Sequence, residues 1–368
     1  MHSKEALIML ANGYYERGFT FSGEGTIYGE FVFVTAMSGY EEVLTDPSYK
    51  GQIIVFTYPL IGNYGITKED GQSEAIHAEA IIIRENSRIY SNHRSRLSLA
   101  EFLQDNKKTG IERIDTRSLT KQIRTQGAMQ GAISTEILEP GELQGQIELA
   151  DSISDINLYK KVVGNTIRII EGTSDNSTKL LAIDFGIKEN ILSDLQRYFN
   201  KIYLVPFDDN FVQNIATIDF DGVFISNGPG DPRIVEKVDK FIREFADNKK
   251  PVIGICFGLQ LVGRSLGLDI VKLPFGHHGA NHPVQYTDNG KVYISSQNHN
   301  YAISKESIEQ SGDWELTWKH LYDGTVSGIK HKSLAINVVQ FHPEASPGPH
   351  DVNHLVFSDF YKTVTESN

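Results

Sequence analysis

The chain has 368 residues, of which 40% are apolar and 22% charged, a composition that is ordinary for a globular protein and a length that suits two domains. The formal net charge of −12 and the lack of clustered Lys and Arg argue against a nucleic-acid partner, because phosphate binding needs such clusters. A single cysteine excludes an intrachain disulfide and a Cys-rich metal site and predicts a reducing, cytoplasmic location, and no stretch is apolar enough to span a membrane.

The N-terminal part of the chain predicts an α+β unit. Apolar, β-rich segments at the N-terminus, at 30–36 and at 51–58 predict strands, because Gly, Pro, Asp and Asn turn residues separate them. A helix is predicted near 118–127, with Gly127 as its stop. GEGTIYGE at 23–30 lacks the strand-then-helix setting of a dinucleotide loop, so we expect a hairpin turn there.

The segment EGTSDNST at 171–178 contains no apolar residue and has the composition of a linker. We therefore predict one domain over 1–172 and a second over 173–368. In the second domain, apolar runs at 179–186 and 201–207 alternate with segments of helical spacing, which predicts a parallel sheet with crossover helices.

Two sequence signals fall at the carboxyl ends of these predicted strands, where parallel sheets bind their ligands. The first is NGPGD at 227–231, and the second is Cys256 in PVIGICFGLQ. Strand-like pieces follow after Leu268, and a last helix is predicted from about 349 to 364.

Gly254 and Gly258 flank Cys256 in the pattern of a nucleophile elbow, a strained turn from a strand to a helix that exposes one side chain. The alternative is that Cys256 simply fills the core, since cysteine is among the most buried residue types. The elbow alone does not choose between the two.

A candidate partner for the thiol follows the apolar strand that ends near Val339. In QFHPE, the Glu344 carboxylate can face the His342 imidazole, fix its tautomer and stabilise its cation. The backbone N–H of Phe257 and the glycine-rich loop at 227–231 are candidate donors to an oxyanion. The alternative for that loop is a Pro-Gly turn before a helix, with Asp231 as its cap.

Together, GICFGLQ, SNGPGDP and QFHPEASPGPHD resemble a class I, triad-type glutamine amidotransferase domain. With MSGYEEVLTDPSYKGQIIVFTYPLIGNYG at 37–65, nearly the whole chain is similar to the carbamoyl phosphate synthase small-chain family. The resemblance implies an α/β fold. Its N-terminal α+β small-chain domain would contact a large chain and roof the glutamine site. A class I amidotransferase domain with a mostly parallel sheet flanked by helices would follow.

The family implies a function and partners. The small chain hydrolyses glutamine to glutamate and ammonia through a cysteinyl thioester and passes the ammonia to the large chain, which makes carbamoyl phosphate for arginine or pyrimidine biosynthesis. The expected assembly is a heterodimer able to assemble further. No cofactor or metal is expected in this chain, and ATP, Mg and bicarbonate are expected on the large chain.

The resemblance also assigns residues. Cys256 is the nucleophile, His342 the acid and base, and Glu344 its orienting partner. The residues implied in glutamine binding are Ser48, Gly228, Gly230, Phe257, Gln260, Asn298, Asn300 and Tyr301.

The chain departs from the family pattern at three places, and the first two of them, CFGLQ and QNHNY, motivate an alternative function. The family usually has CLGHQ where this chain has CFGLQ, QNHGF or QNHGY where it has QNHNY, and HRGANH where it has HHGANH at 277–282. The alternative is a glutaminase-impaired scaffold subunit that activates the large chain, which then uses external ammonia. A further alternative is an amidotransferase that serves another synthase. The histidines at 277, 278, 282 and 299 do not have helix-borne metal-ligand spacing, so we predict no metal there.

Overall fold

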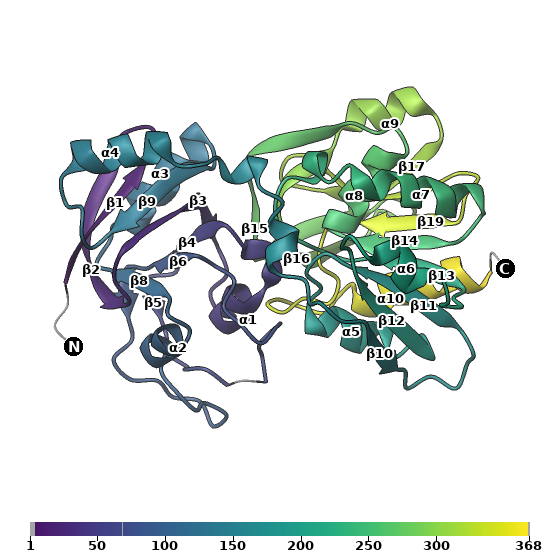
Figure 1. Cartoon of the computed structure of the whole chain (residues 1–368), viewed down its shortest axis with the longest axis horizontal. Helices are drawn as coiled ribbons and strands as arrows, with labels where there is room; N and C mark the ends of the chain where they lie inside the picture. The colour runs from purple at the N-terminus through teal and green to yellow at the C-terminus, as the bar shows by residue number, and fades with distance from the viewer. Residues whose placement is uncertain (1–3, 68, 367–368) are drawn as a thin grey trace. The chain divides into compact units, whose positions relative to one another are not determined.

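The computed structural model describes residues 4–67 and 69–366, which form two compact units (Figure 1). The first unit extends to Ile156 and includes Pro274–Gly279. The second unit comprises Asn157–Leu273 and the chain from Ala280 onward. No helix among the described residues has both the length and the apolar character needed to cross a membrane.

The first unit is built on a closed barrel with the strand order β1-β2-β8-β6-β4-β3-β9. Its strands are β1 (Glu5–Leu10), β2 (Tyr15–Ser22), β3 (Thr26–Val34), β4 (Gln52–Phe56), β6 (Ala80–Ile82), β8 (Thr109–Glu112) and β9 (Met129–Ser134). Two short strands, β5 (Leu60–Ile61) and β7 (Glu85–Asn86), pair separately. The helices are α1 (Tyr40–Thr45), α2 (Leu99–Asp105), α3 (Thr116–Gln126) and α4 (Pro140–Leu149), with a 3₁₀ turn at Pro47–Tyr49.

Strand β1 shows why this unit needs helices outside its barrel. Ala6, Ile8 and Leu10 belong to the core inside the barrel, because alternate residues of a strand share one face. Leu7 and Met9 on the other face pack with residues of α4. The strand is therefore buried on both faces.

The strands predicted in this unit are confirmed, and so is the helix near 118–127, which is α3 and ends before Gly127. Gly127 has φ of 99°, which favours glycine. The predicted hairpin turn at 23–30 is wrong. Strand β2 pairs with β1 and β8, whereas β3 pairs with β4 and β9, because barrel closure places β9 between β1 and β3.

The second unit contains a ten-stranded sheet with the order β10-β12-β11-β13-β14-β19-β18-β17-β15-β16. Five neighbouring strands are parallel: β12 (Lys201–Pro206), β11 (Lys179–Asp184), β13 (Gly222–Ile225), β14 (Val252–Ile255) and β19 (Ile336–Val339). The other strands are β10 (Arg168–Glu171), β18 (Val326–His331), β17 (Trp314–His320), β15 (Ile270–Tyr286) and β16 (Val292–Ile303). This sheet confirms the predicted α/β class, with antiparallel strands added beyond the parallel centre.

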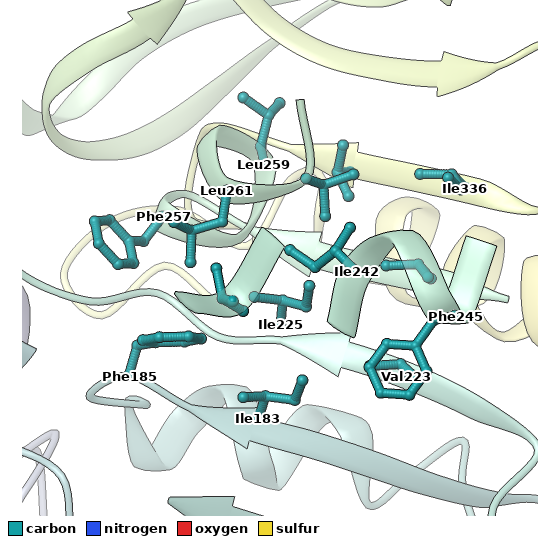
Figure 2. Packing of buried hydrophobic residues seen from close by; sticks show 14 of the residues in the cluster. Ile183, Phe185, Val223, Ile225, Ile242, Phe245, Phe257, Leu259, Leu261 and Ile336 are labelled. Carbon is teal, nitrogen blue, oxygen red and sulfur yellow. The ribbon is translucent and has the colours of Figure 1, made fainter. Parts of the chain in front are cut away.

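Helices cover both faces of the parallel strands, as two buried clusters show. Leu181 and Ile183 of β11 pack on the side of α7 (Lys237–Asp247) and α8 (Phe257–Ser265), and Figure 2 shows part of this cluster. Leu180 and Ala182 of the same strand pack on the opposite side, with residues of α5 (Glu189–Leu195) and α10 (Asn353–Thr365). The remaining helices are α6 (Phe211–Ile215) and α9 (Lys305–Ser311). Strands buried on both faces are typical of parallel sheets.

The division between the two units lies at 156/157, whereas the sequence placed a boundary at 172/173. The reason is the segment before the polar linker. Tyr159 is buried in the core of the second unit, and β10 pairs antiparallel with β12. Linker composition does not reveal these contacts, because they depend on tertiary folding.

Candidate active site

Cys256 lies at the turn between β14 and α8, with φ of 55° and ψ of −102°. A positive φ is strained for a residue with a side chain, and it is the geometry of a nucleophile elbow. A Cβ on Gly258 would lie 2.2 Å from the backbone oxygen of Ile225, and a Cβ on Gly254 would lie 3.0 Å from the same atom. Glycine is thus needed because β13 passes beside the turn.

His342 and Glu344 follow the neighbouring strand, β19. The N–H at Nδ1 of His342 donates to Oε1 of Glu344 over 2.7 Å, and the two side chains are 1% and 0% exposed. The backbone N–H of His342 donates to the carbonyl of Ser296 on β16 over 2.9 Å. The carboxylate therefore fixes the tautomer in which Nε2 is free to accept a proton.

The thiol and the imidazole lie beside the same stretch of β16. The Cys256 thiol donates to the carbonyl of Asn298 over 3.5 Å, two residues along from Ser296. No residue in the described part of the chain forms a hydrogen bond with Nε2 of His342. The Nε2 atom is thus available to take the thiol proton.

Burial and charge oppose each other in this pair. Burial lowers the pKa of His342, but its interactions with Glu344 and Cys256 outweigh burial and raise that pKa to about 10. Burial also raises the pKa of Glu344, but Lys188 and His342 outweigh it and lower that pKa to about 2. The site holds Glu344 as an anion, and this charge stabilises the imidazolium that forms when His342 takes the thiol proton.

Lys188, which the sequence motifs did not indicate, contacts the same carboxylate oxygen of Glu344 as His342 does. Its Nζ lies 2.9 Å from Oε1 of Glu344 and donates to the carbonyls of Ala345 (2.7 Å) and Ser346 (2.8 Å). Its side chain is 2% exposed. A lysine four residues after the end of β11, beyond the carboxyl end of a parallel strand, was the one available signal.

The loop at 227–231 follows β13 at the same edge of the sheet. A Cβ on Gly228 would lie 2.6 Å from the carbonyl oxygen of Phe185, and Gly230 has φ of 95°. Asp231 accepts a hydrogen bond from the N–H of Arg233 and so caps the short 3₁₀ helix Pro232–Ile234. The predicted Asp231 cap is therefore present in the same loop as the candidate oxyanion donors.

Phe257 is the first residue of α8, where a backbone N–H has no partner within the helix. Its ring packs edge-on against Phe185, 5.8 Å between centroids, and is 1% exposed (Figure 2). Leu259 is also fully buried and belongs to the same cluster, whereas Cys256 belongs to the cluster on the other side of the sheet. Both residues of the CFGLQ departure therefore fill the core.

The other residues implied in glutamine binding lie on β16 and α8 of the second unit and, for Ser48, in the first unit. Asn298, Asn300 and Tyr301 lie on β16, and Gln260 lies on α8. Nε2 of Gln260 donates to the carbonyl of Tyr301 (2.7 Å) and to Oε1 of Gln340 (3.1 Å), so α8 is tied to β16. Ser48 belongs to the first unit, in the 3₁₀ turn Pro47–Tyr49, where its N–H donates to Asp46.

Histidines also pair elsewhere in the second unit. Nδ1 of His282 lies 3.0 Å from Nε2 of His320, and Nδ1 of His320 lies 3.1 Å from Asp323. We interpret this pair as a buried hydrogen-bonded contact.

A parallel sheet that carries a cysteine elbow and a His-Glu pair at one edge defines a class of protein, the class I glutamine amidotransferases. Residues 181–363 match the family model described as glutamine amidotransferase class-I. Residues 8–133 match the model described as carbamoyl-phosphate synthase small chain, CPSase domain.

Curated relatives match along almost their whole length. The chain is 45% identical to the carbamoyl phosphate synthase small chain of Aquifex aeolicus, covering 98% of this chain and 98% of that protein. It is 45% identical to the small chain of Thermosynechococcus vestitus, covering 96% and 95%. It is 42% identical to that of Archaeoglobus fulgidus, covering 94% and 95%. The chain therefore belongs to the carbamoyl phosphate synthase small-chain family, and the resemblance drawn from its motifs is confirmed.

Proposed function

We propose that this chain hydrolyses glutamine to glutamate and ammonia and supplies the ammonia to a large synthase chain that makes carbamoyl phosphate. One observation carries the proposal: Cys256 sits on a strained elbow beside a buried His342–Glu344 pair. Family membership supports the substrate and the partner.

In the first half of the reaction, the Cys256 sulfur attacks the carboxamide carbon of glutamine while its proton passes to Nε2 of His342. The carbonyl π electrons move to the oxygen, and the N–H of Phe257 and amides of the 228–230 loop would stabilise that oxyanion. The imidazolium then gives its proton to the leaving nitrogen, the C–N bond breaks and ammonia departs. A glutamyl thioester remains on Cys256.

In the second half, His342 takes a proton from water as the water oxygen attacks the thioester carbon. The second oxyanion collapses, the C–S bond breaks, and the sulfur regains its proton from His342 as glutamate leaves. Glu344 stabilises the imidazolium in both halves, because its charge is held close to Nδ1 throughout.

For glutamine binding we propose Gln260, Asn298, Asn300 and Tyr301, the backbone of Gly228, Gly230 and Phe257, and Ser48 of the first unit. ATP, Mg and bicarbonate would act on the large chain in a cytoplasmic heterodimer. Because Phe257 and Leu259 fill the core, the CFGLQ departure gives no support to the scaffold alternative.

The test compares two nitrogen donors in the complex of this chain with its large chain. Cys256→Ala is expected to abolish carbamoyl phosphate formation from glutamine and to leave formation from ammonia unchanged, because only the first route needs the thiol. A wild-type complex that uses ammonia but not glutamine would contradict the proposal and favour the scaffold.

A further inference from the structure

The loop that follows β13 has to hold its amides in place without the support of regular secondary structure. Its start is fixed where Gly228 passes against Phe185. Its far side is held by Arg264 of α8, whose guanidinium donates to the carbonyl of Val235 over 2.8 Å and also contacts Asp239 and the carbonyl of Pro232. Between these two supports stand Asp231 and Arg233.

Arg233 binds Asp231 through three contacts. Its Nε lies 2.9 Å from Oδ1 and 3.0 Å from Oδ2, and its Nη2 lies 2.6 Å from Oδ2. Asp231 is 3% exposed and Arg233 is 50% exposed. A fork-shaped contact of this kind fixes the plane of the guanidinium as well as its position.

The fixed guanidinium lies over Tyr301. Its Cζ is 5.2 Å from the centre of the tyrosine ring, within the range of a cation–π contact. Lys272 also lies near this ring, with its Nζ 5.8 Å from the centre. The hydrogen bonds to Asp231 raise the pKa of Arg233, and Tyr301 adds to the rise, so the cation is permanent.

The backbone of Tyr301 is already fixed from the other side. Its carbonyl accepts a hydrogen bond from Gln260 over 2.7 Å and lies 2.8 Å from Nδ1 of His299. The ring is held by Arg233. Backbone and ring are thus contacted by different elements, and the ring is linked to the loop at 227–231 through Arg233 and Asp231.

We propose that Arg233 is a positioning residue of the glutamine site, because it ties the loop that carries the candidate oxyanion amides to Tyr301 of the glutamine-binding strand. The inference rests on the proposed function. An ordinary exposed ion pair contributes little to stability and would not affect the use of glutamine. Arg233 differs because its carboxylate partner is buried and because its free face covers a residue of the site.

The experiment uses the complex with the large chain and compares Arg233→Met, Arg233→Lys, Tyr301→Leu and the double variant Arg233→Met/Tyr301→Leu. Arg168→Met is the matched control. Arg168 is also 50% exposed and contacts Glu189 through two hydrogen bonds, at 2.7 and 3.3 Å. KM and kcat are measured for glutamine and for ammonia, together with the melting temperature.

We expect Arg233→Met to lower kcat/KM for glutamine about tenfold, equivalent to ~1.4 kcal/mol, with a higher KM and unchanged use of ammonia. Arg233→Lys should recover only part of this loss, because its ammonium keeps the charge but cannot reproduce the fork-shaped contact with Asp231. The double variant should lose clearly less than the product of the two single losses. Arg168→Met should stay within about twofold of the wild type, because exposed ion pairs contribute little.

Three results would overturn the inference while leaving the proposed function intact. They are a wild-type value of kcat/KM for glutamine in Arg233→Met, single losses that multiply in the double variant, and an equal loss with glutamine and ammonia. A wild-type complex that cannot use glutamine at all would instead remove the proposed function, and this inference with it.

Discussion

Replacing Lys188 by Met tests the electrostatic account of the site in depth. Methionine keeps much of the length of the side chain and removes its charge. In the wild type, Nζ lies 2.9 Å from Glu344, and the two side chains are 2% and 0% exposed. Removing one partner of a buried ion pair typically costs about 3–5 kcal/mol, because the other charge stays buried without compensation. Two carbonyls, those of Ala345 and Ser346, also lose their donor.

The expected results are a large loss of stability and a selective loss of function. A cost of about 3–5 kcal/mol corresponds to a melting temperature lower by roughly 6–20 °C for a domain of this size. The pKa of Glu344 should rise, because Lys188 is the first charge that lowers it. Lys188 also holds the carboxylate oxygen that accepts from His342, so we expect its loss to disturb the position of the imidazole and use of glutamine to fall, while use of ammonia stays near the wild-type rate.

The measurements are thermal unfolding of the small chain and the two-donor assay of the complex. Lys179→Met is the matched control, since Lys179 contacts Asp219 over 2.7 Å in the same unit but is 37% exposed. The control should leave the unfolding free energy close to that of the wild type, because an exposed ion pair contributes little to stability. The reasoning would be refuted if Lys188→Met were as stable as the control, or if it used glutamine at the wild-type rate.

Three further predictions follow from the same geometry. Gly258→Ala should lower the unfolding free energy by about 1–3 kcal/mol and impair use of glutamine, because its Cβ would lie 2.2 Å from the backbone oxygen of Ile225. The control Gly145→Ala in α4, whose Cβ would meet no atom within 4 Å, should be neutral or slightly stabilising. Equal effects of the two variants in chemical denaturation would contradict this expectation. Glu344→Gln should lower use of glutamine roughly 10²–10⁴-fold and bring the pKa of His342 down from about 10, as NMR titration can check; an unchanged pKa would count against the assigned pair. The pH dependence of unfolding should have two limbs. Glu344 stabilises the fold above its ordinary pKa near 4.3 and loses this contribution as the pH falls toward about 2, whereas His342 contributes fully below about 6.5 and loses its contribution as the pH rises through about 10. Parallel pH profiles for the wild type and a Glu344→Gln variant would refute this expectation.

The sequence predicted the elements whose causes are local. Glycines on both sides of Cys256 after an apolar run are a short-range pattern, and the structure has a strained strand-to-helix turn there. Alternating strands and helices after Lys179 predicted a parallel sheet for the same reason. His342 could be placed at a strand end because the apolar run before it is short and continuous.

Features that depend on distant pairing were missed. Barrel closure inserts β9 between β1 and β3, and nothing in GEGTIYGE indicates that. The role of Lys188 depends on carbonyls more than 150 positions away, at Ala345 and Ser346, both of which have positive φ. The contact of Arg233 with Tyr301 likewise joins two segments that only the folded sheet brings together.

The central claim is that Cys256 becomes covalently attached to the side-chain carboxamide carbon (Cδ) of glutamine, and trapping that bond tests it most directly. The complex is mixed with isotopically labelled glutamine, quenched in acid and digested, and the mass of the peptide that contains Cys256 is measured by mass spectrometry. The account predicts a labelled glutamyl thioester on Cys256, with no such adduct when Cys256 is replaced by Ser. Glutamine turnover without label on this peptide, or label on another residue, would contradict it.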